Sequence, residues 1–249
     1  MQPISKLVQR FADDWQSQGP IGALKRVAVS ASWKLYPPRR RFAQALEREQ
    51  QLADEFDRRH NVETARDVPL AEVGITPGAV DRGNGIYRGI WPEMFRSAMS
   101  AVSFDVRPYT FVDYGSGKGK AMMLASHHPF QRIVGVEYSR PLHDVAVENL
   151  KRFSSSEQQC RDLTAVCGDA TAFEPPKGPL LCFFFNPFDD ATTREVISKL
   201  RASVRQEPRP VHLLYVNVRS VRERERAFVS EPGVSLVDRQ RHHLLARLA

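Results

Sequence analysis

The stretch Phe111–Lys120, Phe-Val-Asp-Tyr-Gly-Ser-Gly-Lys-Gly-Lys, constrains the fold more than any other part of the chain. A short apolar strand runs directly into glycines at alternate positions, which predicts a strand, a turn with little side-chain bulk and then a helix. The first turn of such a helix has backbone N–H groups without helical partners, and these can hold a polar or anionic ligand. We therefore expect a nucleotide-like ligand at this turn.

The glycine spacing argues against two common nucleotide motifs. Gly115, Gly117 and Gly119 are separated by single residues, whereas a dinucleotide fingerprint has two residues before its third glycine. A phosphate-binding loop requires Gly-Lys followed by Ser or Thr, and here Lys120 is followed by Ala121. A purely structural turn stays open as an alternative, because a glycine-rich turn alone is a weak signal.

Three later segments each read as a strand that ends in polar or turn-forming residues. Residues 132–137 end in Glu137, where a carboxylate can accept hydrogen bonds from both hydroxyls of a ribose. Residues 163–170 end in Gly-Asp-Ala, and residues 180–188 end in Asn-Pro-Phe. Open α/β sheets bind ligands at the carboxyl ends of their strands, so these residues should meet at one edge. Taken singly, a solvated acid or an ordinary turn would explain each of them.

The pattern Asp-x-Gly-x-Gly-x-Gly from Asp113 to Gly119, followed by these strand ends, resembles the class I S-adenosylmethionine-dependent methyltransferases. The resemblance covers roughly residues 94–249 and implies S-adenosyl-L-methionine as cofactor. It places an acid and the following backbone N–H at the adenine. The expected cofactor-binding residues are Tyr87, Asp113, Gly115, Ser116, Gly117, Gly119, Glu137, Tyr138, Asp169, Ala170 and Asn186.

The candidate catalytic residues are Asn186, Pro187 and Phe188. Amino-methylating members of the family have Asn/Asp-Pro-Pro-Tyr/Phe here, and this chain lacks the second proline. An amide carbonyl, a backbone carbonyl and an aromatic face can accept the hydrogens of an amine and pack against it. Methyl transfer needs little acid–base help, and no Ser/His/Asp or metal-spaced set is visible. We therefore expect methylation of an amine or amide in a protein or small molecule.

Residues 1–93 are predicted to form a helical extension and a loop that covers the cofactor. An exposed, charged helix is expected over residues 41–59. The stretch 83–92 resembles the loop before the first motif in several bacterial methyltransferases of this type and, distantly, in the non-SET nucleosomal lysine methyltransferases. Those relatives have Tyr-x-Pro-Ser/Thr where this chain has Tyr-Arg-Gly-Ile, so we expect no more than a pocket contact from Tyr87.

The order of elements over residues 94–249 predicts an α/β, Rossmann-like domain with a seven-stranded, mostly parallel sheet and helices on both faces. The last two strands almost touch at residues 241–242, which predicts an antiparallel hairpin. The expected strands are 110–114, 132–137, 163–168, 180–186, 211–217, 234–239 and 242–248, and the expected helices are 94–103, 119–127, 141–153 and 191–204.

The net charge of +7 is concentrated near the C-terminus. Residues 194–249 carry twelve Lys and Arg against six Asp and Glu, with four arginines clustered between Arg219 and Arg226. Such a patch would attract nucleic acid, whereas the interleaved glutamates favour a solvated helix face with its own charge pairs. Nucleic acid is therefore a possible but less favoured acceptor.

Cys160, Cys167 and Cys182 are predicted to be reduced core residues rather than a disulfide set or a metal site. With no signal peptide or membrane-spanning stretch visible, we expect a cytoplasmic protein without a membrane partner. Two other functions stay open. The chain could be a nucleoside-binding scaffold without turnover, or a nucleotide-dependent oxidoreductase, which the glycine spacing disfavours.

Overall fold

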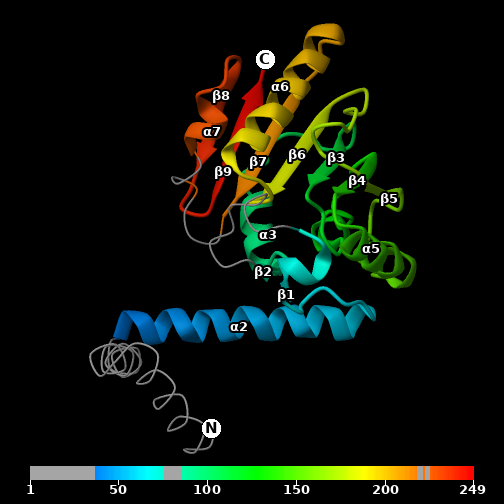
Figure 1. Cartoon of the computed structure of the whole chain (residues 1–249), viewed down its shortest axis with the longest axis vertical. Helices are drawn as coiled ribbons and strands as arrows, with labels where there is room; N and C mark the ends of the chain where they lie inside the picture. Colours follow the sequence, from blue (N-terminus) through cyan, green and yellow to red (C-terminus); the bar gives the residue numbers. More distant parts are fainter. Residues whose placement is uncertain (1–36, 76–85, 218–220, 222–224) are drawn as a thin grey trace, which may run out of the picture. The chain divides into compact units, whose positions relative to one another are not determined.

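The computed structural model describes residues 37–75, 86–217, 221 and 225–249 (Figure 1). The chain divides into two compact units, residues 1–51 and 52–249. Helix α2 (Pro37–His60) begins in the first unit, and its last residues belong to the second. The helix expected over residues 41–59 is confirmed, with wider bounds, and the domain boundary after residue 93 stays a prediction.

A seven-stranded sheet forms the centre of the second unit, in the order β5-β4-β3-β6-β7-β9-β8 (Figure 1). The first five of these strands are mutually parallel, and β9 is antiparallel to both of its neighbours. The predicted sheet and its C-terminal hairpin are confirmed. The strands are β3 (Thr110–Tyr114), β4 (Arg132–Glu137), β5 (Leu163–Cys167), β6 (Leu180–Phe185), β7 (Val211–Val216), β8 (Val234–Arg239) and β9 (His243–Leu248).

Helices cover both faces of the sheet, which explains why the central strand β6 is apolar throughout. In β6, Leu181 and Phe183 pack in the cluster that contains α3 (Pro92–Met99) and α4 (Lys120–Ala125). The alternate residues of β6 pack in the other cluster, with α6 (Asp190–Gln206) and Phe228 of α7 (Glu225–Val229). Helix α5 (Arg140–Arg152) follows β4 and packs on β5. The sequence pattern did not predict α7.

A short N-terminal segment is attached to the sheet domain beside the glycine turn. It contains β1 (Val68–Pro69), the 3-10 turn η1 (Leu70–Val73) and β2 (Ile86–Tyr87), and the two strands are antiparallel. The Ser139 hydroxyl donates to the Val73 carbonyl at 2.6 Å. Asn149 on α5 donates to the carbonyls of Lys118 and Glu63 at 2.9 and 3.0 Å. These bonds fix the segment against the turn and α5.

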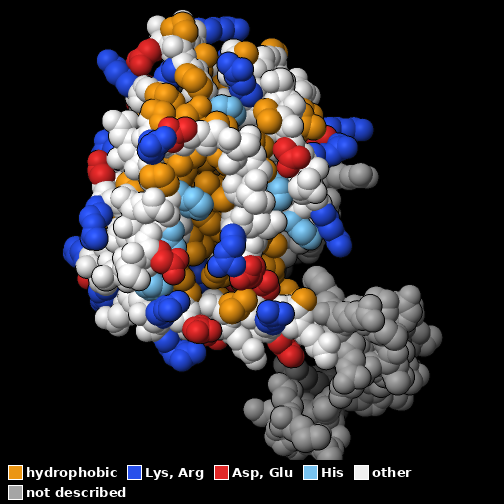
Figure 2. Space-filling model, turned by 180° about the vertical axis from the view of Figure 1, so that it is seen from behind, with side chains coloured by type: hydrophobic (Ala, Val, Ile, Leu, Met, Phe, Trp, Pro, Cys, Tyr) orange, Lys and Arg blue, Asp and Glu red, His pale blue; other side chains and the backbone are white. Residues whose placement is uncertain are grey.

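Charges of both signs are interspersed on the face shown in Figure 2. Glu225 of α7 accepts a hydrogen bond from Arg239 of β8 at 2.7 Å, so this charge pair joins two elements and does not lie along one helix face. Of the predicted basic cluster, Arg226 lies in α7, and the arginines at 219, 222 and 224 lie outside the described residues. Among the helices that the structure describes, none has the length and apolar character needed to cross a membrane. All three cysteines are free.

Gly135 leaves room for the residues that pack over the centre of β4. A Cβ at this position would lie 2.7 Å from Cβ of Ser116 and would collide with the sulfur of Met122. Gly168, at the end of β5, is different, because a Cβ there would meet no atom within 4 Å. The two glycines therefore allow a matched comparison of the same substitution, to alanine, at a crowded and at an open position.

We expect Gly135→Ala to lower the free energy of unfolding by about 1–3 kcal/mol, because the extra methyl group forces the glycine turn or α4 to move. Gly168→Ala should change it by no more than about 0.5 kcal/mol. Urea denaturation of both variants measures the difference. Equal stabilities for the two would contradict the packing described for β4.

Candidate functional site

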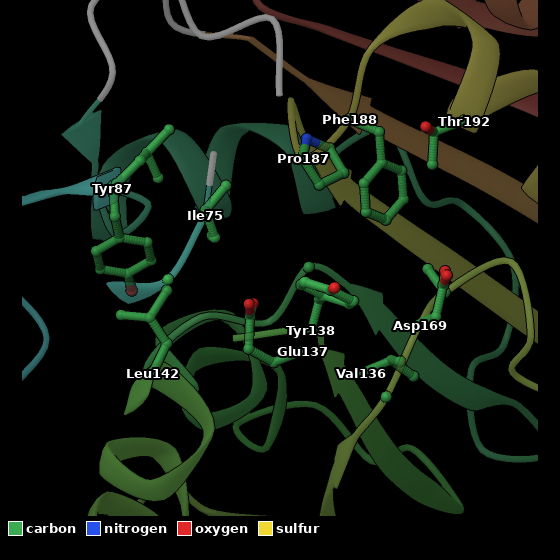
Figure 3. Close-up of a pocket in the computed structure, with 15 residues that line it drawn as sticks. Ile75, Tyr87, Val136, Glu137, Tyr138, Leu142, Asp169, Pro187, Phe188 and Thr192 are labelled. Atoms are coloured by element: carbon green, nitrogen blue, oxygen red, sulfur yellow. The ribbon is translucent and has the colours of Figure 1, made fainter. Parts of the chain in front are cut away.

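A cavity of about 310 Å³ opens at the carboxyl edge of the parallel strands (Figure 3). Pro187 and Phe188 lie on one side of it, and Glu137, Tyr138 and Asp169 on the other (Figure 3). Of the residues predicted from the sequence, the cavity is lined by Tyr87, Gly115, Glu137, Tyr138, Asp169, Ala170, Pro187 and Phe188. Asp113, Ser116, Gly117, Gly119 and Asn186 lie beneath or beside it and do not line it.

Each glycine of the turn has a left-handed backbone, with φ of 78° at Gly115, 53° at Gly117 and 83° at Gly119. Their missing side chains also let other segments approach. A Cβ on Gly115 would lie 2.5 Å from Cβ of Pro187, and one on Gly117 would collide with the Tyr87 ring. The glycines are therefore required both by conformation and by the close approach of the cavity walls.

Glu137 is buried at the end of β4, and backbone groups fix its carboxylate. Gly117 N–H donates to Oε2 at 2.7 Å, and Ser139 N–H donates to Oε1 at 2.8 Å. A carboxylate oxygen can accept more than one hydrogen bond, so these two bonds alone do not use all the acceptor positions of the carboxylate. The carboxylate is thus oriented before any ligand binds.

Asp169, Tyr138 and Phe188 provide the more open part of the cavity wall. One oxygen of Asp169 accepts hydrogen bonds from the backbone N–H and the hydroxyl of Thr171, both at 2.8 Å. The Tyr138 side chain is 68% exposed, which is unusual for a large aromatic residue. These rings and the acid can accommodate a flat ligand with hydrogen-bond donors on its edge.

Two polar side chains at the glycine turn have a buried oxygen atom without a hydrogen-bond partner. Asp113 is 2% exposed, and its Oδ2 has no hydrogen bond; the Ser116 hydroxyl is also buried without one. Burial, and to a smaller extent the Glu137 carboxylate, raise the pKa of Asp113 to about 8. The turn therefore covers unsatisfied polar groups, which a folded protein usually avoids unless the site has a use for them.

The side-chain oxygen of Asn186 accepts a hydrogen bond from another side chain. The Tyr215 hydroxyl donates to Oδ1 of Asn186 at 2.7 Å and accepts a hydrogen bond from Nδ2 of Asn217 at 3.2 Å. The Asn186 backbone has φ of 45°, a left-handed value that is uncommon outside glycine. Tyr215 was not predicted as a site residue, because it lies within the apolar run of β7.

Several other residues of the cavity wall were not predicted. Leu142 lies in the first turn of α5 and Thr192 in the first turn of α6, so their positions just after strand ends could have suggested them. Leu70 and Ile75 come from the N-terminal segment, which carries no periodic pattern. The unpredicted lining residues are Leu70, Gly74, Ile75, Val136, Leu142, Gly168 and Thr192.

The histidine pair at 242–243 lies beside a second cavity, of about 730 Å³, between the end of α3 and the β8–β9 hairpin. Nδ1 of His242 is 3.2 Å from the Asn217 carbonyl oxygen, and Nε2 of His243 is 3.8 Å from Asp238. Over the described ranges, no three His, Cys, Asp or Glu side chains form a group able to hold a metal ion. The two rings thus have separate partners.

No family model and no curated protein matches the chain. Solved structures are similar at low sequence identity. The methyltransferase domain of bacterial CtHen1 is 15% identical, with 64% of this chain and 99% of that chain covered and a TM-score of 0.46. Magnesium protoporphyrin IX methyltransferase from Synechocystis, with bound SAM, is 15% identical, with 64% and 79% covered and a TM-score of 0.45. TrmN from Thermus thermophilus is 12% identical, with 65% and 50% covered and a TM-score of 0.48.

Asp113→Asn should stabilise the protein increasingly as the pH rises from 4 to 8. The Asp113 pKa is raised from 3.8 to about 8, so in this range the carboxyl is protonated in the folded state and ionised in the unfolded state. The wild type therefore loses stability with rising pH, and the variant does not. We expect an advantage of about 2–4 kcal/mol for the variant at pH 8, after the cost of the buried amide, and little advantage at pH 4.

Urea denaturation across this pH range measures the effect. Asp105→Asn is the control, because Asp105 is exposed and its hydrogen bonds from Arg107 lower its pKa. The control should gain no stability with rising pH. An advantage of Asp113→Asn that is constant with pH would contradict the burial of a neutral carboxyl.

Proposed function

We propose that the protein is an S-adenosylmethionine-dependent methyltransferase. One observation carries the proposal: acids that follow two neighbouring parallel strands meet a glycine turn at a single cavity. Glu137 ends β4, Asp169 follows β5, and Gly115 follows β3. A nucleoside needs hydrogen-bond acceptors for its sugar and its base at separate places, and these two acids supply them.

The residues fit the parts of this cofactor. Glu137 would accept hydrogen bonds from the ribose hydroxyls, since backbone N–H groups already hold its carboxylate. Asp169 and the Ala170 backbone would meet the adenine, with the exposed Tyr138 ring beside them.

The cofactor, when bound, supplies a methyl group on a sulfonium that is already a good leaving group. The chain must mainly orient the acceptor and exclude water. At the cavity, the Pro187 backbone carbonyl can accept a hydrogen from an amine, and the Phe188 ring offers a flat apolar face. We therefore propose that the protein methylates the nitrogen of an amine or amide, on a protein side chain or a small molecule.

Asn186 has a different part in this proposal from the one expected from its motif. Its Oδ1 already accepts a hydrogen bond from the Tyr215 hydroxyl. We therefore propose that the Pro187 carbonyl accepts the hydrogen bond from the amine. A nucleic acid is the second candidate acceptor, because the net charge is +7. The interspersed charges of the visible face make it the less favoured one (Figure 2).

Titration calorimetry with S-adenosylmethionine tests the cofactor site. Glu137→Ala should weaken binding by about 1–3 kcal/mol, because the charged hydrogen bonds to the ribose are lost. Glu174→Ala is the matched control, since Glu174 is an 85%-exposed glutamate that does not line the cavity. Thermal unfolding without ligand shows whether each variant is folded. A folded Glu137→Ala variant with wild-type affinity would refute the ribose assignment.

Labelled S-adenosylmethionine and a cell lysate identify the acceptor class. We expect label in the protein fraction or in small molecules that carry an amine or amide. Label in nucleic acid would favour the second candidate. Tight binding of the cofactor with no label in any fraction would instead support a nucleoside-binding scaffold and contradict the enzymatic proposal.

A further inference from the structure

We infer that Tyr215 and Asn217 are positioning residues that hold the Asn186–Pro187–Phe188 corner so that its backbone carbonyl faces a bound amine. This rests on the proposed function. The starting observation is the backbone of Asn186, which has φ of 45° although the next residue is a proline. A proline disfavours helical conformations in the residue before it, and a left-handed conformation is itself costly outside glycine.

Such a conformation persists only when its surroundings enforce it. Here the constraint comes from the neighbouring strand β7. The Tyr215 hydroxyl donates to Oδ1 of Asn186 at 2.7 Å, the usual length of an O–H···O hydrogen bond, in a partly buried place. Tyr215 is 2% exposed, and its ring packs against Phe228 with the centroids 4.6 Å apart. The hydroxyl is therefore held by a ring that cannot easily move.

Asn217 sets the direction of the Tyr215 hydroxyl. Its Nδ2 donates to the Tyr215 oxygen at 3.2 Å, so the phenol uses its single proton for Asn186. The Asn217 backbone is fixed in turn, because its N–H donates to the His242 carbonyl at 2.9 Å. The chain of bonds thus runs from the β8–β9 connection through Asn217 and Tyr215 to Asn186.

The consequence for the site lies in the next residue. Pro187 is buried against Gly115, where a Cβ would come within 2.5 Å of it. A change in the Asn186 backbone would turn the peptide that follows, and the carbonyl of Pro187 would lose its direction. Tyr215 acts through Asn186 and does not line the cavity. Tyr215 thereby helps to determine where the amine substrate donates its hydrogen bond. The Asn-Pro-Phe motif alone does not reveal this role.

Two nucleosides distinguish this role from general support of the fold. S-adenosylhomocysteine lacks the methyl group, whereas sinefungin carries an amine at the corresponding place. In wild type, sinefungin should bind about tenfold more tightly than S-adenosylhomocysteine, because its amine donates to the Pro187 carbonyl. In Tyr215→Phe this preference should fall to near one, while the affinity for S-adenosylhomocysteine changes by less than about twofold.

Three further variants sharpen the calorimetric test. Asn217→Asp gives the Tyr215 proton a competing acceptor, so it should abolish the preference as well, and it carries the test if Tyr215→Phe does not fold. Tyr114→Phe is the control, since Tyr114 is buried in the same core and, among the described residues, makes no hydrogen bond to Asn186. In an Asn186→Gly background, Tyr215→Phe should have no further effect, because glycine needs no support at φ of 45°.

The possible results separate the two proposals. A preference that Tyr215→Phe leaves intact, or an equal loss of affinity for both nucleosides, would overturn the positioning role and leave the proposed function standing. Equal wild-type affinities for the two nucleosides would overturn it as well. If neither nucleoside binds to wild type, the proposed function fails, and this inference fails with it.

Discussion

The Glu137 carboxylate joins the parts of the structure on which the site depends. It ends β4, accepts the N–H of Gly117 from the turn after β3, and accepts the N–H of Ser139 at the start of α5. A buried carboxylate is costly unless its oxygens are hydrogen-bonded, and bonds between a charged acceptor and backbone donors are among the stronger ones. The same contacts satisfy N–H groups that the glycine turn would otherwise leave unpaired. The geometry of the ligand site is therefore part of the fold.

A second acid, Asp113, lies close to Glu137 in a different environment. Asp113 lies beside Gly135 on the neighbouring strand, and it is buried without a partner for Oδ2. Backbone donors hold the Glu137 carboxylate in place, whereas burial raises the pKa of Asp113 to about 8 and so keeps Asp113 protonated at neutral pH. An unsatisfied acid costs stability, and natural proteins retain such costs mainly at functional sites. Its place beneath the turn is consistent with that view.

The sheet and much of the cavity wall could be predicted because they follow from local patterns. Each parallel strand contains a run of apolar residues, and Glu137 and Asp169, at or just after the ends of two such strands, reach the same edge when the strands pair. Asp113, by contrast, was predicted to bind the cofactor and does not line the cavity. The period of two along β3 places it on the same face as Phe111, which is in the core, so alternation already argued against a wall position. Leu70 and Ile75 could not be found, since no periodic pattern marks their segment.

The contacts at the glycine turn connect Glu137 to the segment Asn186–Phe188 on the other side of the cavity. Glu137 accepts a hydrogen bond from Gly117, and Gly115 in the same turn packs against Pro187. Asn186, the residue before that proline, accepts a hydrogen bond from Tyr215 of β7. Each step is a contact that tolerates little displacement: a charged hydrogen bond, a glycine without room for a methyl group, and a strained backbone. A change on β7 therefore reaches the corner without passing through the ligand. This is the physical basis of the positioning role that we propose for Tyr215, which lies outside the cavity.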